Sequence, residues 1–270
     1  MPVNHYENFP VASVLLPTRL RKPVELIYRF ARAADDFADE GELPDRERLA
    51  LLASFSDELR MIERGEPSRV ALFRELAPMI KAHGLPLNLF HDLLSAFAQD
   101  VTRKRYADYT EVLDYCRRSA NPVGRLLLVL YGAATPQNLG WSDNVCSSLQ
   151  IINFLQDIAV DDAKGRIYMP QDELARFRVS EAQIAARDTS GAWRDFMTFQ
   201  VNRTRRMLWD GASLGRALPG RTGLEMRMII AGGDRILGKV IATGYDVFRH
   251  RPVLRAYDWP LMLMNTLSIR

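Results

Sequence analysis

The sequence is poor in cysteine, with only Cys116 and Cys146 among its 270 residues. Both lie in apolar segments with helical spacing, and two isolated thiols provide neither a disulfide framework nor a zinc site. The four histidines show no metal-ligand spacing, and none is placed as a general base would be. These absences favour a reducing compartment, and we predict a cytoplasmic protein.

The chain also lacks a hydrophobic run long enough to cross a bilayer. Its longest apolar stretch, residues 126–131 with small residues after it, falls far short of the roughly 20 residues that a transmembrane helix needs. The N-terminus has no basic segment followed by an apolar run, which argues against a secretory signal. The apolar segment 259–264, preceded by Arg249, His250 and Arg251, leaves open a peripheral contact with an anionic membrane.

A strong charge of one sign is missing as well. The 36 basic and 33 acidic residues give a net charge of +3, which is too small to indicate a nucleic-acid partner. The glycines at 211–215 and 232–233 lie in helical context without a preceding strand, so they form no nicotinamide-binding fingerprint. We therefore expect neither a nucleic acid nor NADPH as a partner.

The positive signal in this sequence is helical periodicity. Apolar residues recur at three and four positions nearly throughout, for example Leu52, Phe55, Leu59 and Ile62, whereas the alternation typical of strands is scarce. Turn residues interrupt the pattern at 41–44, 65–68, 84–86, 135–136 and 219–220. No linker divides the chain, so we predict a single all-α domain over residues 1–270.

One predicted helix, Val24 to Asp39, carries a narrow polar stripe. Tyr28, Arg32, Asp35 and Asp39 stand at steps of four, three and four, which places them on one face. Most of the other positions are apolar or small, and a helix of that composition is normally buried. The stripe must therefore face groups that satisfy it.

A second predicted helix repeats this arrangement with Gln150, Asn153, Asp157 and Asp161, at steps of three, four and four. Either acidic pair alone is more often a solvated face than a site. Two pairs together are less easily explained, because uncompensated carboxylates in a core cost several kcal/mol each or become protonated. A shared polar cavity that holds cations accounts for both.

Oxygen ligands without nearby His or Cys indicate a hard cation. Magnesium takes few carboxylates, retains waters and is completed by phosphate oxygens. Arg32 fits that interpretation as a phosphate contact, and an intrahelical salt bridge to Asp35 or Asp36 fits its spacing equally well. Asp100 is likewise open to two interpretations, a part of this site or a helix-terminal salt bridge.

The chain resembles the squalene/phytoene synthase family from end to end. The matching segments are Asn8-Phe9-Pro10, Leu15-Leu16-Pro17, Tyr28-Arg29-Phe30-Ala31-Arg32 with Asp35-Asp36-Phe37-Ala38-Asp39, Tyr115-Cys116 with Val123-Gly124, the Gln150 to Asp161 stripe, and Gly165 to Leu174. The last two, in that order and spacing, are highly specific.

The resemblance implies an isoprenoid synthase fold, a helical bundle around a central hydrophobic tunnel with Mg²⁺ at its mouth. Asp35, Asp39, Asp157 and Asp161 would then be catalytic and metal-binding, and Tyr115 would be a further catalytic residue. The other implied residues are Asn153 as a further metal ligand, Gln150 in support, Tyr28 and Arg32 at the diphosphate, Phe9, Tyr115, Val123 and Gly124 in the tunnel, and Arg166 and Tyr168 as substrate contacts.

The chain departs from family members that condense two prenyl diphosphates. Gln156 stands where those usually carry Arg, Gly233 where they tend to carry Tyr, and Glu7 where they carry Lys. The loss of three phosphate-binding groups suits an enzyme that receives one diphosphate. The resemblance is greatest to the bacterial hopanoid-pathway branch, which implies a carbon–oxygen lyase that converts presqualene diphosphate and water to hydroxysqualene.

Two other functions stay open from the sequence. One is head-to-head condensation of two farnesyl or geranylgeranyl diphosphates, as in a squalene or phytoene synthase. The other is a non-catalytic helper, although all four aspartates are present. The expected partners are a prenyl diphosphate, a membrane surface in peripheral contact and neighbouring enzymes of the pathway.

Overall fold

The computed structural model describes residues 16–39 and 41–266. Thirteen helices account for nearly all of the regular structure in those ranges, and an isolated bridge between Arg105 and Ile167 is the one strand-like pairing. The helices are α1 (Thr18–Asp39), α2 (Asp45–Arg64), α3 (Ala71–His83), α4 (Leu87–Thr102), α5 (Tyr109–Ser119), α6 (Asn121–Leu130), α7 (Pro136–Ala163), α8 (Gln171–Phe177), α9 (Glu181–Ala185), α10 (Trp193–Asp210), α11 (Leu214–Ala217), α12 (Gly220–Ala242) and α13 (Asp258–Thr266). The predicted all-α class is confirmed.

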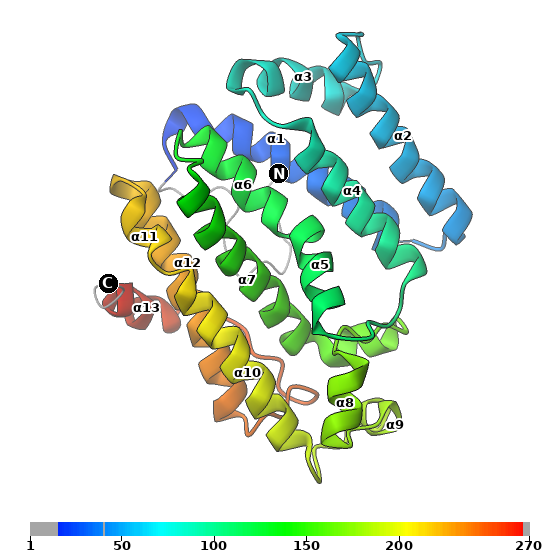
Figure 1. The fold of residues 1–270 in the computed structure, drawn as a ribbon, viewed down its shortest axis with the longest axis vertical. Coiled ribbons are helices and arrows are strands. Elements are labelled where there is room, and N and C mark those ends of the chain that lie inside the picture. Colours follow the sequence, from blue (N-terminus) through cyan, green and yellow to red (C-terminus); the bar gives the residue numbers. More distant parts are fainter. Residues whose placement is uncertain (1–15, 40, 267–270) are drawn as a thin grey trace.

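The long helix α7 is the centre of the bundle (Figure 1). It packs against α6 on one side and against α10 and α12 on the other. Its first turn is fixed locally, because the Thr135 hydroxyl accepts a hydrogen bond from the Asn138 amide and Pro136 occupies an early helical position. The helix ends at Ala163, where Gly165 adopts a positive φ of 74° and turns the chain into the next loop.

The apolar interior consists of two large clusters. The first joins α1 to α4 with α6 and contains four phenylalanines in mutual edge or stacked contact, Phe30, Phe55, Phe73 and Phe90. The second joins α5 and α7 with the C-terminal helices. The first acidic pair lies on a helix of the first cluster and the second pair on the main helix of the second, so the fold brings them together where the clusters meet.

One helix boundary differs from the prediction. The helix predicted from Val24 begins at Thr18, and Pro23 lies within it. A proline normally favours a helix start, but its missing N–H and fixed φ remain tolerable close to the N-terminus. The predicted breaks between the other helices match the observed ends, and Asn121 begins a new helix directly after α5.

Candidate active site

An elongated cavity of about 390 Å³ runs between α1, α4, α6 and α12. This volume is in the range of small-molecule sites. Its lining is mainly apolar, and the charged members are Arg32, Asp35 and Glu225. The lining residues are Leu16, Val24, Ile27, Tyr28, Ala31, Arg32, Asp35, Phe97, Val123, Leu127, Tyr131, Thr222, Glu225, Met226 and Ile229. An apolar cavity with a polar group of each sign suits a ligand with a hydrocarbon chain and a charged end.

The stripe on α1 lies partly in this cavity. Tyr28, Arg32 and Asp35 line it, whereas Asp39 at the end of the helix borders a second, smaller cavity. Arg32 makes ion pairs with Asp35 at 3.3 Å and Asp36 at 2.7 Å, so the intrahelical salt bridge forms in this structure while the side chain also reaches the cavity.

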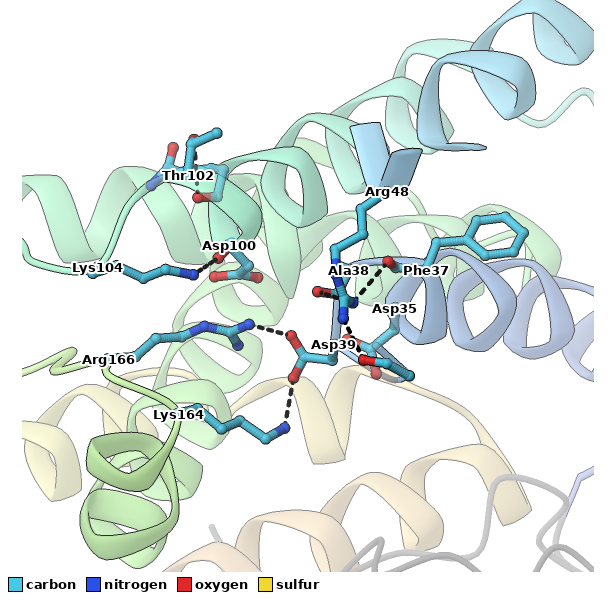
Figure 2. A network of polar contacts seen from close by, with 12 residues as sticks. Asp35, Phe37, Ala38, Asp39, Arg48, Asp100, Thr102, Lys104, Lys164 and Arg166 are labelled. Atoms are coloured by element: carbon cyan, nitrogen blue, oxygen red, sulfur yellow. Dashed lines mark hydrogen bonds and ion pairs between the residues drawn. The ribbon is translucent and has the colours of Figure 1, made fainter. Parts of the chain in front are cut away.

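The two carboxylates of the first pair have different surroundings. Burial, together with the negative charge of Asp39, raises the pKa of Asp35 to about 7. Burial also acts on Asp39, but hydrogen bonds from Arg166 at 2.6 Å and Lys164 at 3.0 Å hold its pKa below the ordinary value. Figure 2 shows both cations converging on Asp39 from the loop that follows α7. Asp39 is thus held by two cations from a distant loop, whereas Asp35 pairs with Arg32 of its own helix and keeps a raised pKa.

The second pair, on α7, repeats this asymmetry. Asp157 accepts hydrogen bonds from both the Nε and the Nη2 of Arg251, and the Nη2 lies 3.0 Å from Oδ2. Burial and the charge of Asp157 raise the pKa of Asp161 to about 7. On the same stripe Asn153 is exposed and Gln150 is half-buried. Each helix therefore carries one carboxylate held by a cation from a distant segment and one whose pKa is raised to about 7.

The four aspartates suit a divalent cation that takes part of its ligands from another molecule. Among the described residues no three His, Cys, Asp or Glu side chains are placed to hold a single ion. The carboxylates instead form two pairs, and the charge of Asp39 contributes to the raised pKa of both Asp35 and Asp161. Magnesium needs only one or two carboxylates when waters and phosphate oxygens complete its shell, so the arrangement suits Mg²⁺ bound together with a diphosphate.

Asp100 forms a buried polar centre that neither sequence interpretation anticipated. It is 4% exposed and accepts hydrogen bonds from the hydroxyls of Tyr115 at 2.5 Å and Tyr168 at 2.8 Å. Burial raises its pKa to about 6, against the effect of these hydrogen bonds. Tyr168 also stacks on Phe154 with ring centroids 3.9 Å apart. Tyr115 and Tyr168 thus meet at Asp100, outside the lining of the cavity between α1, α4, α6 and α12.

Val123 and Gly124 are adjacent but serve different contacts. Val123 lines the cavity between α1, α4, α6 and α12, whereas Gly124 faces α7. A Cβ atom at Gly124 would lie 2.3 Å from the Ser142 hydroxyl oxygen and 2.6 Å from the Cys146 sulfur. The glycine therefore permits α6 and α7 to approach closely, a requirement that its sequence position did not reveal.

At two of the positions where the sequence departs from the condensing enzymes, Gln156 and Gly233, the residue contacts other parts of the protein. Gln156 is 1% exposed, and its amide donates to the backbone carbonyl of Pro252 at 2.5 Å. A Cβ atom at Gly233 would lie 3.1–3.2 Å from Leu149, Leu208 and Ile152. Gln156 thus attaches α7 to the segment before α13, and Gly233 lets α12 approach α7 and α10 closely. Glu7 and the predicted tunnel residue Phe9 lie outside the described residues.

Two cations of the site were not predicted from the sequence as partners of the aspartates. Lys164 lies in the segment between α7 and α8. Its position between Asp161 and Arg166 could have indicated that it lies near the acidic pairs. Arg251, expected with Arg249 and His250 to face lipid, pairs with Asp157 instead. No local pattern could have revealed that contact, because 94 positions separate the two residues.

Comparison with known proteins shows which sequences and folds this chain is similar to. The chain is 39% identical to a hydroxysqualene synthase of Rhodopseudomonas palustris, with 97% of this chain and 88% of that protein covered. It is 28% identical to a phytoene synthase of Arthrospira platensis, with 97% and 88% covered. A crystal structure of a squalene synthase from Alicyclobacillus acidocaldarius superposes with a TM-score of 0.83 at 34% identity, covering 89% of this chain and 90% of that one.

The family model described as squalene/phytoene synthase matches residues 3–258, which include both acidic pairs and the segment from Gly165 to Leu174. The match spans nearly the whole chain, and its helices carry the cavity described above. The chain therefore belongs to the squalene/phytoene synthase family.

Proposed function

We propose that this protein converts presqualene diphosphate and water to hydroxysqualene and diphosphate, as a step toward squalene and hopanoids. Its similarity to hydroxysqualene synthases, at 39% and 34% identity, supports this reaction over others in the family. The intact set of four aspartates supports an enzyme rather than a non-catalytic helper.

One structural observation carries the choice of a single-diphosphate substrate. Gln156 and Gly233 stand where condensing enzymes hold phosphate-binding side chains. Here Gln156 donates to the Pro252 carbonyl, and Gly233 lies close to Leu149, Leu208 and Ile152. Introducing a phenol at Gly233 would require three aliphatic side chains to move. The chain thus lacks two groups for a second diphosphate and retains the first acidic pair with Arg32 beside the cavity.

In this proposal Asp35, Asp39, Asp157 and Asp161 hold Mg²⁺, with Asn153 as a further ligand and Gln150 in support. Bound Mg²⁺ neutralises the diphosphate and makes it a better leaving group. Arg32 and Tyr28 orient the diphosphate end at the cavity, while Arg166 approaches it from the loop after α7. Tyr168 and Tyr115 position Asp100 and the aromatic rings around it.

The apolar lining protects the carbocation that forms. The carbon–oxygen bond breaks heterolytically, and its electron pair leaves with the diphosphate. Val123, Phe97 and Tyr131 exclude bulk water from the hydrocarbon chain, and the aromatic faces stabilise positive charge without acting as bases. After the cyclopropylcarbinyl cation rearranges, a water oxygen bonds to carbon and releases one proton. No hydride donor is required.

A second candidate function is the head-to-head condensation of two prenyl diphosphates. Its support is the similarity to phytoene synthases at 28–30% identity over most of the chain. Product analysis separates the two proposals. Purified protein with Mg²⁺ and no nicotinamide is offered presqualene diphosphate or farnesyl diphosphate in separate reactions. Hydroxysqualene from presqualene diphosphate alone supports the first proposal, and consumption of farnesyl diphosphate by itself supports the second.

We also propose that residues 1–270 form one domain that rests on a membrane through α13. No described helix has the length and apolarity needed to cross a bilayer. In α13 the buried positions are Asp258, Met262 and Thr266, and the other positions are apolar except Asn265: Trp259, Pro260, Leu261, Leu263 and Met264. An exposed apolar surface with an aromatic residue and the neighbouring Arg255 suits the interface of an anionic membrane, which would accept the water-insoluble product.

A further inference from the structure

The cavity between α1, α4, α6 and α12 has a second polar end, far from the acidic pairs. Its lining on α12 includes Thr222 and Glu225, and its lining on α6 ends at Tyr131. The other lining residues of these two helices are apolar: Val123, Leu127, Met226 and Ile229. We call Tyr131, Thr222 and Glu225 the distal polar group. No step of the proposed reaction involves the carboxyl group of Glu225.

The helix α7 shows that the distal polar group and the first acidic pair lie at opposite ends of the cavity. Tyr131 packs against the same small apolar cluster as Leu139 and Trp141, which belong to the N-terminal end of α7. Asp39 contacts Lys164, directly after the C-terminal end of that helix. Because α7 has 28 residues, its two ends are about 42 Å apart. In Figure 1, α6 ends and α7 begins at the upper left, on the same side of the bundle as α11.

The members of the distal polar group lie close enough to act on one another. Burial and the negative charge of Glu225 raise the pKa of Tyr131. Thr222 lies one turn before Glu225, and its hydroxyl donates to the Pro219 carbonyl at 2.7 Å. The charges that act most on the pKa of Asp35 belong instead to α1 and α4. A carboxyl group and a phenol thus end a cavity whose walls are mainly apolar.

These polar groups limit how far a hydrocarbon chain extends into the cavity. A prenyl chain with its diphosphate at Arg32 and Asp35 runs along the apolar walls toward Tyr131. While that chain stops short of Glu225, the carboxyl group keeps its hydration. A longer prenyl chain covers the carboxyl group with hydrocarbon, which costs free energy because the polar group loses water and gains no hydrogen bond from the ligand.

We propose that the distal polar group sets the length of the prenyl chain that the protein accepts, with Glu225 as the main specificity-determining residue. The protein then favours farnesyl-derived substrates over geranylgeranyl-derived ones, whose branches are one isoprene unit longer. This inference rests on the proposed function, because it takes the substrate to be a prenyl diphosphate held at the acidic pairs. It adds that the opposite end of the cavity decides which prenyl diphosphate is used.

The test is a calorimetric titration of two unreactive analogues, farnesyl and geranylgeranyl thiolodiphosphate, in separate runs with Mg²⁺. The ratio of the two dissociation constants is compared between variants. We expect the unmodified protein to bind the farnesyl analogue about tenfold more tightly. Glu225→Leu should reduce that preference to about twofold or less, because hydrocarbon then meets hydrocarbon. Tyr131→Phe should reduce it by a smaller factor, since it removes a single hydroxyl.

The matched control is Arg221→Leu. Arg221 lies one turn before Glu225 on α12, is exposed and does not line the cavity, so this variant should keep the preference of the unmodified protein. If Glu225→Leu does not fold, Glu225→Gln keeps the side-chain shape and should still lower the preference about threefold. An unchanged preference in the Glu225 variant, or no preference in the unmodified protein, overturns this inference and leaves the proposed function standing. If neither analogue binds, both fail.

Discussion

The two acidic pairs are similar in sequence but are balanced by different parts of the chain. On α1, Asp39 is held by Lys164 and Arg166, which come from the loop after α7. On α7, Asp157 is held by Arg251, which comes from the segment before α13. In both pairs the other carboxylate has a pKa raised to about 7. In each pair, therefore, one carboxylate is held by a cation from a distant segment and the other keeps a raised pKa.

The difference between the pairs lies in what they connect. The cations on Asp39 follow directly after Asp161, and their charges also act on the pKa of Asp161, so the first pair is tied to the second. Arg251 instead ties the second pair to the C-terminal segment. The contacts of Asp39 with Lys164 and Arg166 join the two acidic pairs to each other. The contact of Asp157 with Arg251 joins the second pair to the segment that precedes α13.

The largest expected effect on activity comes from removing one carboxylate of either acidic pair. Asp35→Ala or Asp157→Ala should lower turnover by about a thousandfold or more, because diphosphate departure loses its electrostatic stabilisation. Far-ultraviolet circular dichroism should remain that of the unmodified protein. Asp36→Ala, one position from Asp35 and off the stripe, serves as the control. Full activity in either stripe variant contradicts the assignment of a cation site.

Stability in the absence of metal should separate the two members of each pair. Asp39→Asn leaves two cations without their partner and should lower the free energy of unfolding by about 2 kcal/mol. Asp161→Asn removes the cost of a buried charge and its repulsion from Asp157, and should raise the free energy of unfolding by about 1 kcal/mol. Urea unfolding in EDTA measures both. If the free energy of unfolding changes in the same direction in both variants, the proposed difference between the two members of a pair is wrong.

The pH dependence of unfolding sharpens the same contrast. The pKa of folded Asp161 is about 7 and the ordinary value is 3.8, so between these values the folded protein holds a proton that the unfolded chain has lost. The stability from this group is therefore fully present below about pH 4 and is lost as pH rises through about 7. The advantage of Asp161→Asn should be absent near pH 4 and complete by about pH 8.

Asp39 should behave in the opposite sense. Its folded pKa is lowered, so its stabilising contribution is present above the ordinary pKa and is lost as pH falls through the lower folded value. The penalty of Asp39→Asn should accordingly shrink toward low pH. A penalty that instead grows as pH falls would mean that Lys164 and Arg166 do not hold this carboxylate.

The smallest effect concerns the surface helix to which the second pair is linked. Trp259→Ser should weaken cosedimentation with vesicles of anionic and zwitterionic phospholipid about fivefold, since part of an exposed indole would otherwise be buried in the interface. Trp209→Ser is a matched control, because Trp209 and Trp259 are both 41% exposed and lie on different helices. Equal losses in the two variants remove the case for membrane contact through α13.

Much of this arrangement could be predicted from the sequence because it is local. Helical periodicity placed Asp35 with Asp39, and Asp157 with Asp161, on single faces, and turn residues marked five of the boundaries between helices. What could not be predicted depends on residues far apart in the chain. Arg166 and Asp39 are separated by 127 positions, and Tyr168 and Asp100 by 68. Such contacts follow from how helices pack, and no spacing within one helix encodes them.

The account depends most directly on water ending the reaction of a single diphosphate. A reaction of presqualene diphosphate in ¹⁸O-labelled water, with Mg²⁺ and without nicotinamide, tests this by mass spectrometry of the product. We predict hydroxysqualene that carries one ¹⁸O atom from the solvent. Unlabelled product, or no product from presqualene diphosphate when farnesyl diphosphate alone is consumed, would contradict the proposed function.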